Sequence, residues 1–111
     1  MELTERQEGD ATVITLTGRL TVNDKPGLLK GAVAAAVGRG ARHVVLDLGA
    51  VKYIDSTRLG ELIAAHVTLS RQGGRLSLAG VPARVKELLD MAGLDGVFSR
   101  YASVGDAIAG H

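Results

Sequence analysis

Stretches typical of β-strands alternate along this sequence with stretches typical of amphipathic helices, and this order constrains the fold most. Residues 43–48 form a nearly continuous apolar run, as expected for a strand that is buried on both faces. Strands that alternate with helices pair in parallel through right-handed crossovers. We therefore expect an α/β sheet with this strand near its centre. The helix before it has apolar residues at helical spacing: Leu28, Leu29, Ala32, Val33, Ala36 and Val37.

Turn and cap residues predict the other elements. Residues 3–8 and 11–18 are predicted as two strands, and Gly9-Asp10 between them suits a tight antiparallel hairpin. Two further strands are expected at 75–79 and 97–101. Helices are expected to begin at a cap of Asn23 or Asp24, near Ser56, at Pro82 and after Ser103. Residues 1–111 thus predict one domain, with a mostly parallel mixed sheet, an N-terminal antiparallel hairpin and about four helices.

Composition narrows the functional class. Thirteen Lys and Arg against twelve Asp and Glu give a net charge of +1, and the basic residues are scattered, which argues against direct nucleic-acid binding. The chain has no cysteine, which excludes thiolate metal sites and fits a reducing compartment. No apolar run approaches the roughly 18 residues that span a bilayer. We expect a cytoplasmic protein without membrane insertion, bound metal or other cofactor.

The segment 51–60 joins the central strand to the following helix. In an open α/β sheet, such junctions face the crevice where ligands and partners bind. Asp55, Ser56 and Thr57 are all good N-cap residues, and a single cap satisfies the helix backbone. Three in a row exceed that need and favour a functional role. A plain helix cap without regulatory chemistry is the alternative.

This segment resembles the signature of the STAS family, the domain shared by sulfate transporters and bacterial anti-sigma factor antagonists. The resemblance is carried by Asp55-Ser56-Thr57 and Leu59-Gly60, which follow an apolar strand ending in Leu46-Asp47-Leu48. It extends over nearly the whole chain, through Gly18-Arg19-Leu20 and the stretch 84–94. The resemblance implies a STAS-like fold and a partner-switching protein that is not an enzyme.

In such systems the unphosphorylated antagonist binds an anti-sigma factor, which is also a serine kinase, and so frees the sigma factor. The kinase phosphorylates the serine that follows the motif aspartate, and a serine phosphatase resets it. By position the resemblance assigns this role to Ser56, with Thr57 as the alternative. Because strand ends and a helix N-terminus meet on one rim of the sheet, we expect a partner surface there. It comprises Thr21, Asp24, Asp55, Ser56, Thr57 and Arg58.

The chemistry of a phosphoserine agrees with a switch at Ser56. A phosphate adds roughly −1.5 to −2 charges at neutral pH. At a helix N-terminus, free amides and the helix dipole stabilise it, so the domain need not unfold. The Asp55 carboxylate and the desolvation in a close-packed interface oppose the added charge. We therefore expect phosphorylation to break a partner contact and leave the fold intact.

Two departures from the family keep other functions open. Arg58 stands where the family usually has glycine, and we expect its guanidinium to reach back toward a phosphate on Ser56 or outward to a partner. Thr21 stands where an acid is common, and Asp24 is the nearest acid. A never-phosphorylated STAS subunit of a phospholipid ABC transporter is therefore an alternative. A nucleotide-binding STAS module is another, although no phosphate-binding motif supports it.

Three other features have simpler interpretations. The stretch 38–42 superficially suggests a phosphate loop, but it follows a helix and is predicted to end that helix. Asp47 is expected to bond a nearby loop amide. His66 is expected to be packed or hydrogen-bonded, because no second His or Cys lies at ligand spacing. The apolar stripe of its helix is predicted to comprise Leu59, Leu62, Ile63, His66 and Val67.

Overall fold

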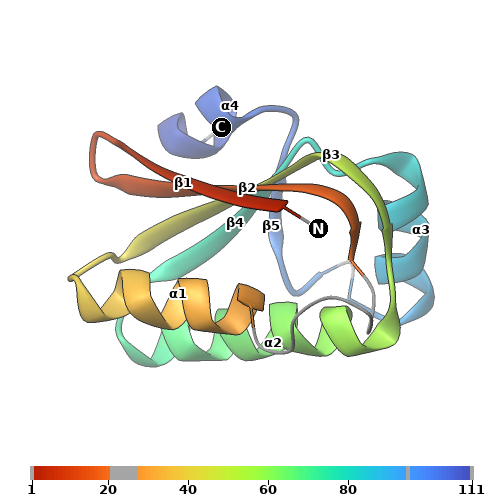
Figure 1. The fold of residues 1–111 in the computed structure, drawn as a ribbon, viewed down its shortest axis with the longest axis horizontal. Helices are drawn as coiled ribbons and strands as arrows, with labels where there is room; N and C mark the ends of the chain where they lie inside the picture. The colour runs from red at the N-terminus through yellow and green to blue at the C-terminus, as the bar shows by residue number, and fades with distance from the viewer. Residues whose placement is uncertain (1, 21–27, 95, 111) are drawn as a thin grey trace.

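The computed structural model describes residues 2–20, 28–94 and 96–110, and in them it confirms the predicted mixed α/β architecture (Figure 1). One five-stranded sheet has the strand order β1-β2-β3-β4-β5, with β1 antiparallel to β2 and the other neighbours parallel. The strands are β1 (Glu2–Glu8), β2 (Ala11–Leu20), β3 (His43–Ile54), β4 (Arg75–Ala79) and β5 (Ser99–Tyr101). The helices are α1 (Leu28–Gly38), α2 (Ser56–Arg71), α3 (Ala83–Met91) and α4 (Val104–Ala109).

Helices cover both faces of the sheet, but unequally. In Figure 1, α1 and α2 lie side by side against one face and α4 lies against the other. The larger core includes Ile14, Leu16, Leu29, Val33, Val44, Leu46, Leu62, Leu69, Leu78 and Leu89. The smaller core, beneath α4, comprises Ala11, Val13, Val45, Ala79 and Ala107. Neighbouring residues of β3 therefore enter different cores, which is why its sequence is continuously apolar.

Strand β3 runs past the predicted end at Leu48 to Ile54. Its pairing with β4 stops where Asp47 lies opposite Ala79, whereas its pairing with β2 continues through two shifts of register. Beside the first shift, the Asp47 carboxylate accepts a hydrogen bond from the Gly49 N–H at 3.1 Å, as predicted for a nearby amide. Such irregularities bend a strand. The far part of β3 accordingly curves away from β4 and leads into α2 (Figure 1).

The buried face of α2 differs from the predicted stripe. Ile63 and Val67 are 37% and 38% exposed, so they do not belong to the core. The helix buries Leu59 and Leu62 as predicted, and with them positions 58, 65 and 69, which together have the spacing of one helical face. The helix is therefore rotated about its axis relative to the prediction, and this rotation turns Arg58 inward.

The remaining elements agree closely with the sequence. The Ser103 hydroxyl accepts a hydrogen bond from the Asp106 N–H at 3.1 Å, which caps α4 as predicted. Gly93 follows α3 with φ +74°, the left-handed conformation predicted to terminate that helix. Strand β5 is shorter than predicted, because residues 97 and 98 are not part of it. The predicted cap of the first helix lies outside the described residues.

Candidate functional site

Asp55 is the N-cap of α2. Its backbone is extended, with φ −95° and ψ 176°, and its carboxylate accepts a hydrogen bond from the Arg58 N–H at 2.9 Å. Its carbonyl oxygen accepts the first backbone bond of the helix, from Leu59 at 3.0 Å. Of the three candidate N-cap residues in the sequence, Asp55 is therefore the one that caps the helix. The hydroxyls of Ser56 and Thr57 are not needed for it.

Ser56 is the first residue of α2, and both Ser56 and Thr57 are exposed. Neither hydroxyl has a hydrogen-bond partner within the described ranges. The Ser56 hydroxyl is therefore accessible at the positive end of the helix, where amide groups favour a negatively charged substituent. Modification of this hydroxyl requires no hydrogen bond between described residues to break.

Arg58 lies inside the domain and not on the rim. Only 2% of its surface is exposed, and its guanidinium forms an ion pair with Glu61, whose side chain is 12% exposed. The expectation of a guanidinium that points outward to a partner is therefore wrong for this structure, and contact with a phosphate on Ser56 stays a prediction. The cause is the rotation of α2, which turns position 58 toward the core, where a carboxylate one turn along balances the charge.

The predicted site residues thus differ in where the structure places them. It brings Asp55, Ser56 and Thr57 together at the start of α2 and buries the Arg58 side chain beside them. Thr21 and Asp24 lie outside the described residues. The sequence reasoning missed Glu61, although an acid three residues after an arginine in a helix is a signal for an ion pair.

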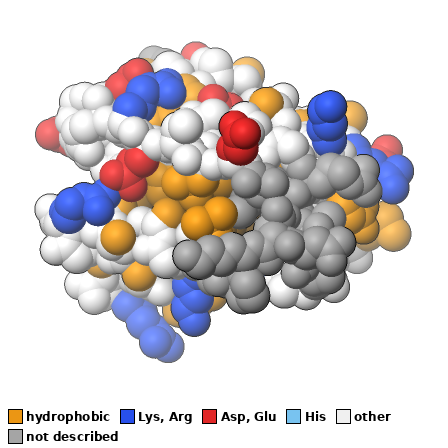
Figure 2. Space-filling view, in the orientation of Figure 1, with side chains coloured by type: hydrophobic (Ala, Val, Ile, Leu, Met, Phe, Trp, Pro, Cys, Tyr) orange, Lys and Arg blue, Asp and Glu red, His pale blue; other side chains and the backbone are white. Residues whose placement is uncertain are grey.

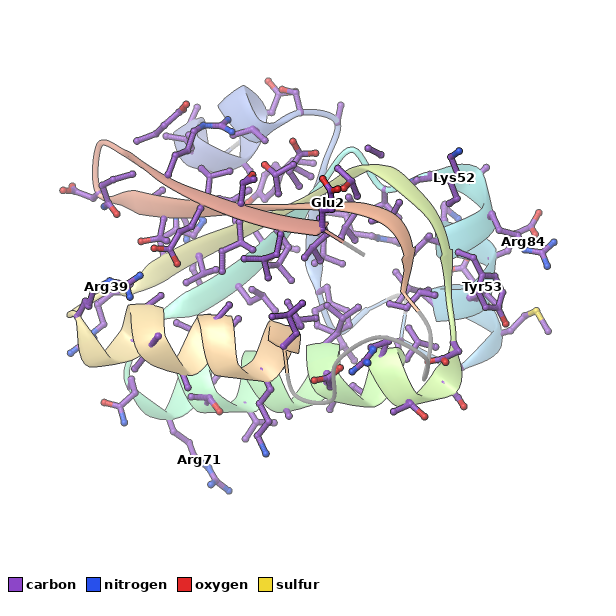
Figure 3. All side chains as sticks on the ribbon, in the orientation of Figure 1. Glu2, Arg39, Lys52, Tyr53, Arg71 and Arg84 are labelled. Atoms are coloured by element: carbon purple, nitrogen blue, oxygen red, sulfur yellow. The ribbon has the colours of Figure 1, made fainter. Side chains whose placement is uncertain are left out.

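Arg39 and Arg71 lie far from the surface around Ser56. Figure 3 places Lys52 and Tyr53, just before the site, at one end of the molecule and Arg39 at the other. Arg71 is the last residue of α2 and lies a full helix length from Ser56. On the face seen in Figure 2, Lys and Arg side chains are scattered over the surface.

The described histidines are remote from Ser56. His43 is the first residue of β3 and lies at the far end of that strand. Burial, and then the charge of Arg75, lowers the pKa of His43. His66 lies ten residues along α2, about 15 Å from the helix start. It packs edge to face on Phe98 with ring centroids 5.6 Å apart, which confirms a packed histidine. Neither imidazole is placed to act as a base on Ser56.

Across the ranges 2–20, 28–94 and 96–110, no three His, Cys, Asp or Glu side chains gather as a metal-binding group. Within the same ranges, every helix is too short or too polar to cross a membrane.

Comparison with known proteins identifies the class. The family model described as "Mlab, STAS domain" matches residues 3–100, and the chain therefore belongs to the STAS domain family. Among curated relatives, the "Anti-sigma F factor antagonist" of Paenibacillus polymyxa is 30% identical over 70 residues. That match covers 63% of this chain and 60% of the relative, so it spans less than two thirds of the relative's length.

Solved structures agree on the fold. An anti-sigma factor antagonist from Mycobacterium paratuberculosis has a TM-score of 0.86 at 23% identity, over 98% of this chain and 92% of that one. The Bacillus cell fate determinant SpoIIAA in its phosphorylated form has a TM-score of 0.76 at 19% identity, over 97% of each chain. At these identities the likeness concerns the fold.

Proposed function

We propose that this protein is a cytoplasmic anti-sigma factor antagonist and not an enzyme. It binds an anti-sigma factor that is also a serine kinase, and phosphorylation of Ser56 ends that binding until a serine phosphatase removes the phosphate. The main supporting observation is that different residues cap α2 and expose a hydroxyl at its start. Asp55 caps the helix, and the exposed Ser56 hydroxyl beside it is accessible to a kinase. The name of the curated relative supports the same class of function.

The proposed switch acts through charge at the partner surface. A phosphate on Ser56 brings roughly −1.5 to −2 charges next to the Asp55 carboxylate. Arg58 is the nearest cation in sequence, but its guanidinium is buried and paired with Glu61. The added charge therefore remains directed at the partner, where desolvation makes it unfavourable. The cap is unchanged, so the fold is expected to survive phosphorylation.

The proposed contact surface comprises Asp55, Ser56 and Thr57, with Thr21 and Asp24 included on the sequence argument alone. Arg58 supports this surface from inside, by holding the first turn of α2 against the core.

The experiment compares partner binding by Ser56→Asp, Ser56→Ala and the wild type, with capture from native lysate followed by titration of the recovered partner. Ser70→Asp is the matched control, because Ser70 is also exposed on α2 but lies near its other end. Ser56→Asp is expected to weaken binding by about tenfold or more, because it places a second carboxylate beside Asp55 on a surface that loses water when the partner binds. Ser56→Ala and Ser70→Asp are expected to bind as the wild type does.

Intact-mass measurement after kinase treatment tests the modified residue. Ser56→Ala is expected to take up no phosphate. Undiminished uptake in Ser56→Ala would move the site to Thr57 or elsewhere. A wild-type protein that its demonstrated cognate kinase leaves unmodified would contradict the switch and favour the transporter-subunit alternative.

A further inference from the structure

The outer edge of strand β1 is open to another strand. β1 is the first strand in the order of the sheet, and within the described residues only β2 pairs with it. It lies at the front of Figure 1, between α4 on one side and α1 on the other. Six of its seven residues are exposed. Residues 2–8 include no proline, and their pairing with β2 has no bulge, so neither of these common obstacles blocks the edge.

The hairpin turn determines which backbone groups of β1 point outward. The pair that closes the two-residue turn is Glu8 and Ala11, and such a pair exchanges both of its N–H···O=C bonds. The even-numbered residues of β1 therefore bond to β2, since hydrogen-bonded pairs alternate along an antiparallel ladder. The N–H and C=O groups of Leu3, Glu5 and Gln7 point away from β2, and no other described backbone group bonds to them.

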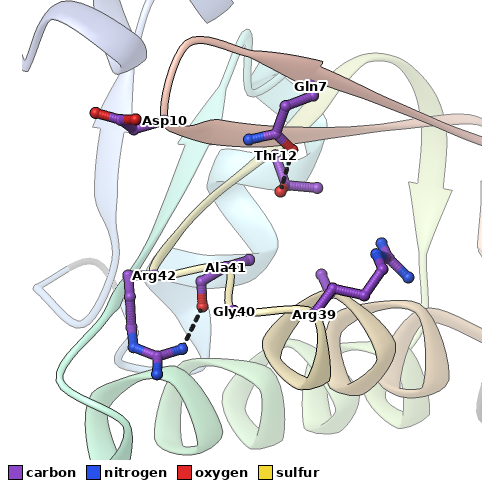
Figure 4. Close-up of a pocket in the computed structure, with 8 residues that line it drawn as sticks. Gln7, Asp10, Thr12, Arg39, Gly40, Ala41 and Arg42 are labelled. Carbon is purple, nitrogen blue, oxygen red and sulfur yellow. Dashed lines mark hydrogen bonds between the residues drawn. The ribbon is translucent and has the colours of Figure 1, made fainter.

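Side chains at the hairpin end of β1 are engaged within the chain. Thr12 Oγ1 donates to Gln7 Oε1 at 2.9 Å beside a cavity of about 490 Å³ (Figure 4). Gln7 Nε2 donates to the Gly9 carbonyl at 3.3 Å, and Glu5 forms an ion pair with Arg39 of α1. These side chains therefore have little to offer to a second strand.

Two opposite charges near the N-terminal end of β1 are less engaged. The Glu2 carboxylate is exposed, and it has no ion-pair partner among the described residues (Figure 3). Arg6 contacts Glu8 through Nε alone, at 2.7 Å, and the Arg6 side chain is 49% exposed. Its two Nη groups can therefore bind a second carboxylate. Glu2 and Arg6 lie four residues apart on one strand, so they point to the same face of the sheet.

These two charges complement each other when two copies of β1 pair antiparallel around a two-fold axis at Thr4. Glu2 of each copy then lies opposite Arg6 of the other, and no like charges face each other. The two Thr4 side chains meet at the axis. On the other face of the sheet the two Leu3 side chains are diagonal neighbours, close enough for apolar contact.

Other registers bring like charges together or pair fewer residues. An axis at Glu5 would place Glu2 opposite Glu8 twice and Glu5 opposite itself. An axis at Arg6 would place two arginines opposite each other, and an axis at Leu3 would pair only residues 2–4 of the described strand. Like charges directly opposite each other destabilise a sheet, whereas opposite charges stabilise it. The charges of β1 therefore favour the axis at Thr4.

We propose that β1 pairs with β1 of a second copy of this chain, antiparallel and around a two-fold axis at Thr4, so that the two sheets become one. Backbone hydrogen bonds join Leu3 of each copy to Glu5 of the other, and Glu2 pairs with Arg6. The contact is small, so its dissociation constant is expected between about 10 µM and 1 mM. The pairing is separate from Ser56 and does not depend on the proposed switch.

A disulfide at the axis tests the register. Thr4 is exposed and would face its counterpart in a non-hydrogen-bonded pair, in which Cα atoms are about 4.5 Å apart and within disulfide reach. The chain has no cysteine, so Thr4→Cys introduces a single thiol. With oxidised glutathione, Thr4→Cys is expected to form a covalent dimer about tenfold faster than Glu8→Cys, which is exposed on the same strand but outside the paired segment. Equal rates for the two variants would overturn the proposal.

Charge exchange tests the pairing without a cross-link. In sedimentation equilibrium at low ionic strength, the wild type is expected to form dimers at about 1 mM. Glu2→Arg is expected to raise the dissociation constant about tenfold, because it turns two attractive pairs of the dimer into repulsive ones. Glu2→Arg/Arg6→Glu is expected to recover wild-type association, and the control Glu8→Arg is expected to change it little. A monomeric wild type, no recovery in the double variant, or equal losses in Glu2→Arg and Glu8→Arg would refute the pairing.

Discussion

The Arg58–Glu61 ion pair is expected to contribute measurably to stability, and replacing Glu61 by Gln tests this. The substitution removes a carboxylate from a guanidinium that is only 2% exposed. Removing one partner of a buried ion pair costs about 3–5 kcal/mol. Because the Glu61 side chain is still 12% exposed, we expect a cost near the lower limit, about 3 kcal/mol.

Replacing the other partner of the pair, Arg58, is expected to cost less stability. Arg58→Met removes the charge and retains an aliphatic chain in the core, and the residue left without its ion-pair partner, Glu61, is the less buried of the two, with side chains 12% and 2% exposed. We expect a cost of about 1–2 kcal/mol. The double variant Arg58→Met/Glu61→Gln is expected to lose less stability than the two single variants lose together. The reason is that neither substitution then leaves the charge of the other residue without its ion-pair partner.

Urea unfolding followed by circular dichroism measures all three free energies and gives the coupling energy from a double-mutant cycle. The exposed pair Lys86–Asp90 is the control, with side chains 57% and 39% exposed, and its coupling is expected to be at most about 0.5 kcal/mol. A Glu61→Gln cost below about 1 kcal/mol, together with a coupling near zero, would refute the assigned role of the pair.

Three further features give separate predictions for stability. Asp55→Ala removes the cap of α2 and is expected to destabilise by about 1 kcal/mol in urea unfolding; no change would mean that another residue caps the helix. Gly74→Ala is expected to destabilise by about 2 kcal/mol, because the added Cβ would overlap the Arg42 carbonyl oxygen. Gly60→Ala, with nothing within 4 Å of its Cβ, is expected to stabilise by up to about 1 kcal/mol, and equal losses at both glycines would contradict this. Since the pKa of His43 is lowered, the unfolded chain binds the proton more readily, and stability should fall as pH falls through its ordinary pKa of 6.5; His43→Gln should flatten the change of Tm between about pH 7 and 5, and an unchanged slope would contradict that.

The order of strands and helices was predictable because its signals are local. Apolar spacing, turn residues and caps such as Ser103 each act within a few residues. The full length of β3 was not predictable in this way. Gly49 and Lys52 interrupt its apolar run, and residues 49–54 are a strand because they pair with β2 across the sheet.

The candidate site was predictable in part for the same reason. Asp55–Thr57 mark a helix start by local chemistry, but the choice of Asp55 as the cap depends on backbone geometry. The burial of Arg58 was missed because an isolated arginine is normally exposed. Its position four residues before Leu62, on the buried face, shows that the rotation of the whole helix decided its environment.

The strand order has a consequence for synthesis on the ribosome. Each strand of the sheet lies beside the strand that precedes it in the chain. A chain that emerges from its N-terminus therefore offers every new strand a completed neighbour, and the sheet can grow in one direction as translation proceeds. Helix α4 is different, because Ala107 packs with Ala11 and Val13 of β2 on the opposite face. That face is covered only when the last described helix has left the ribosome.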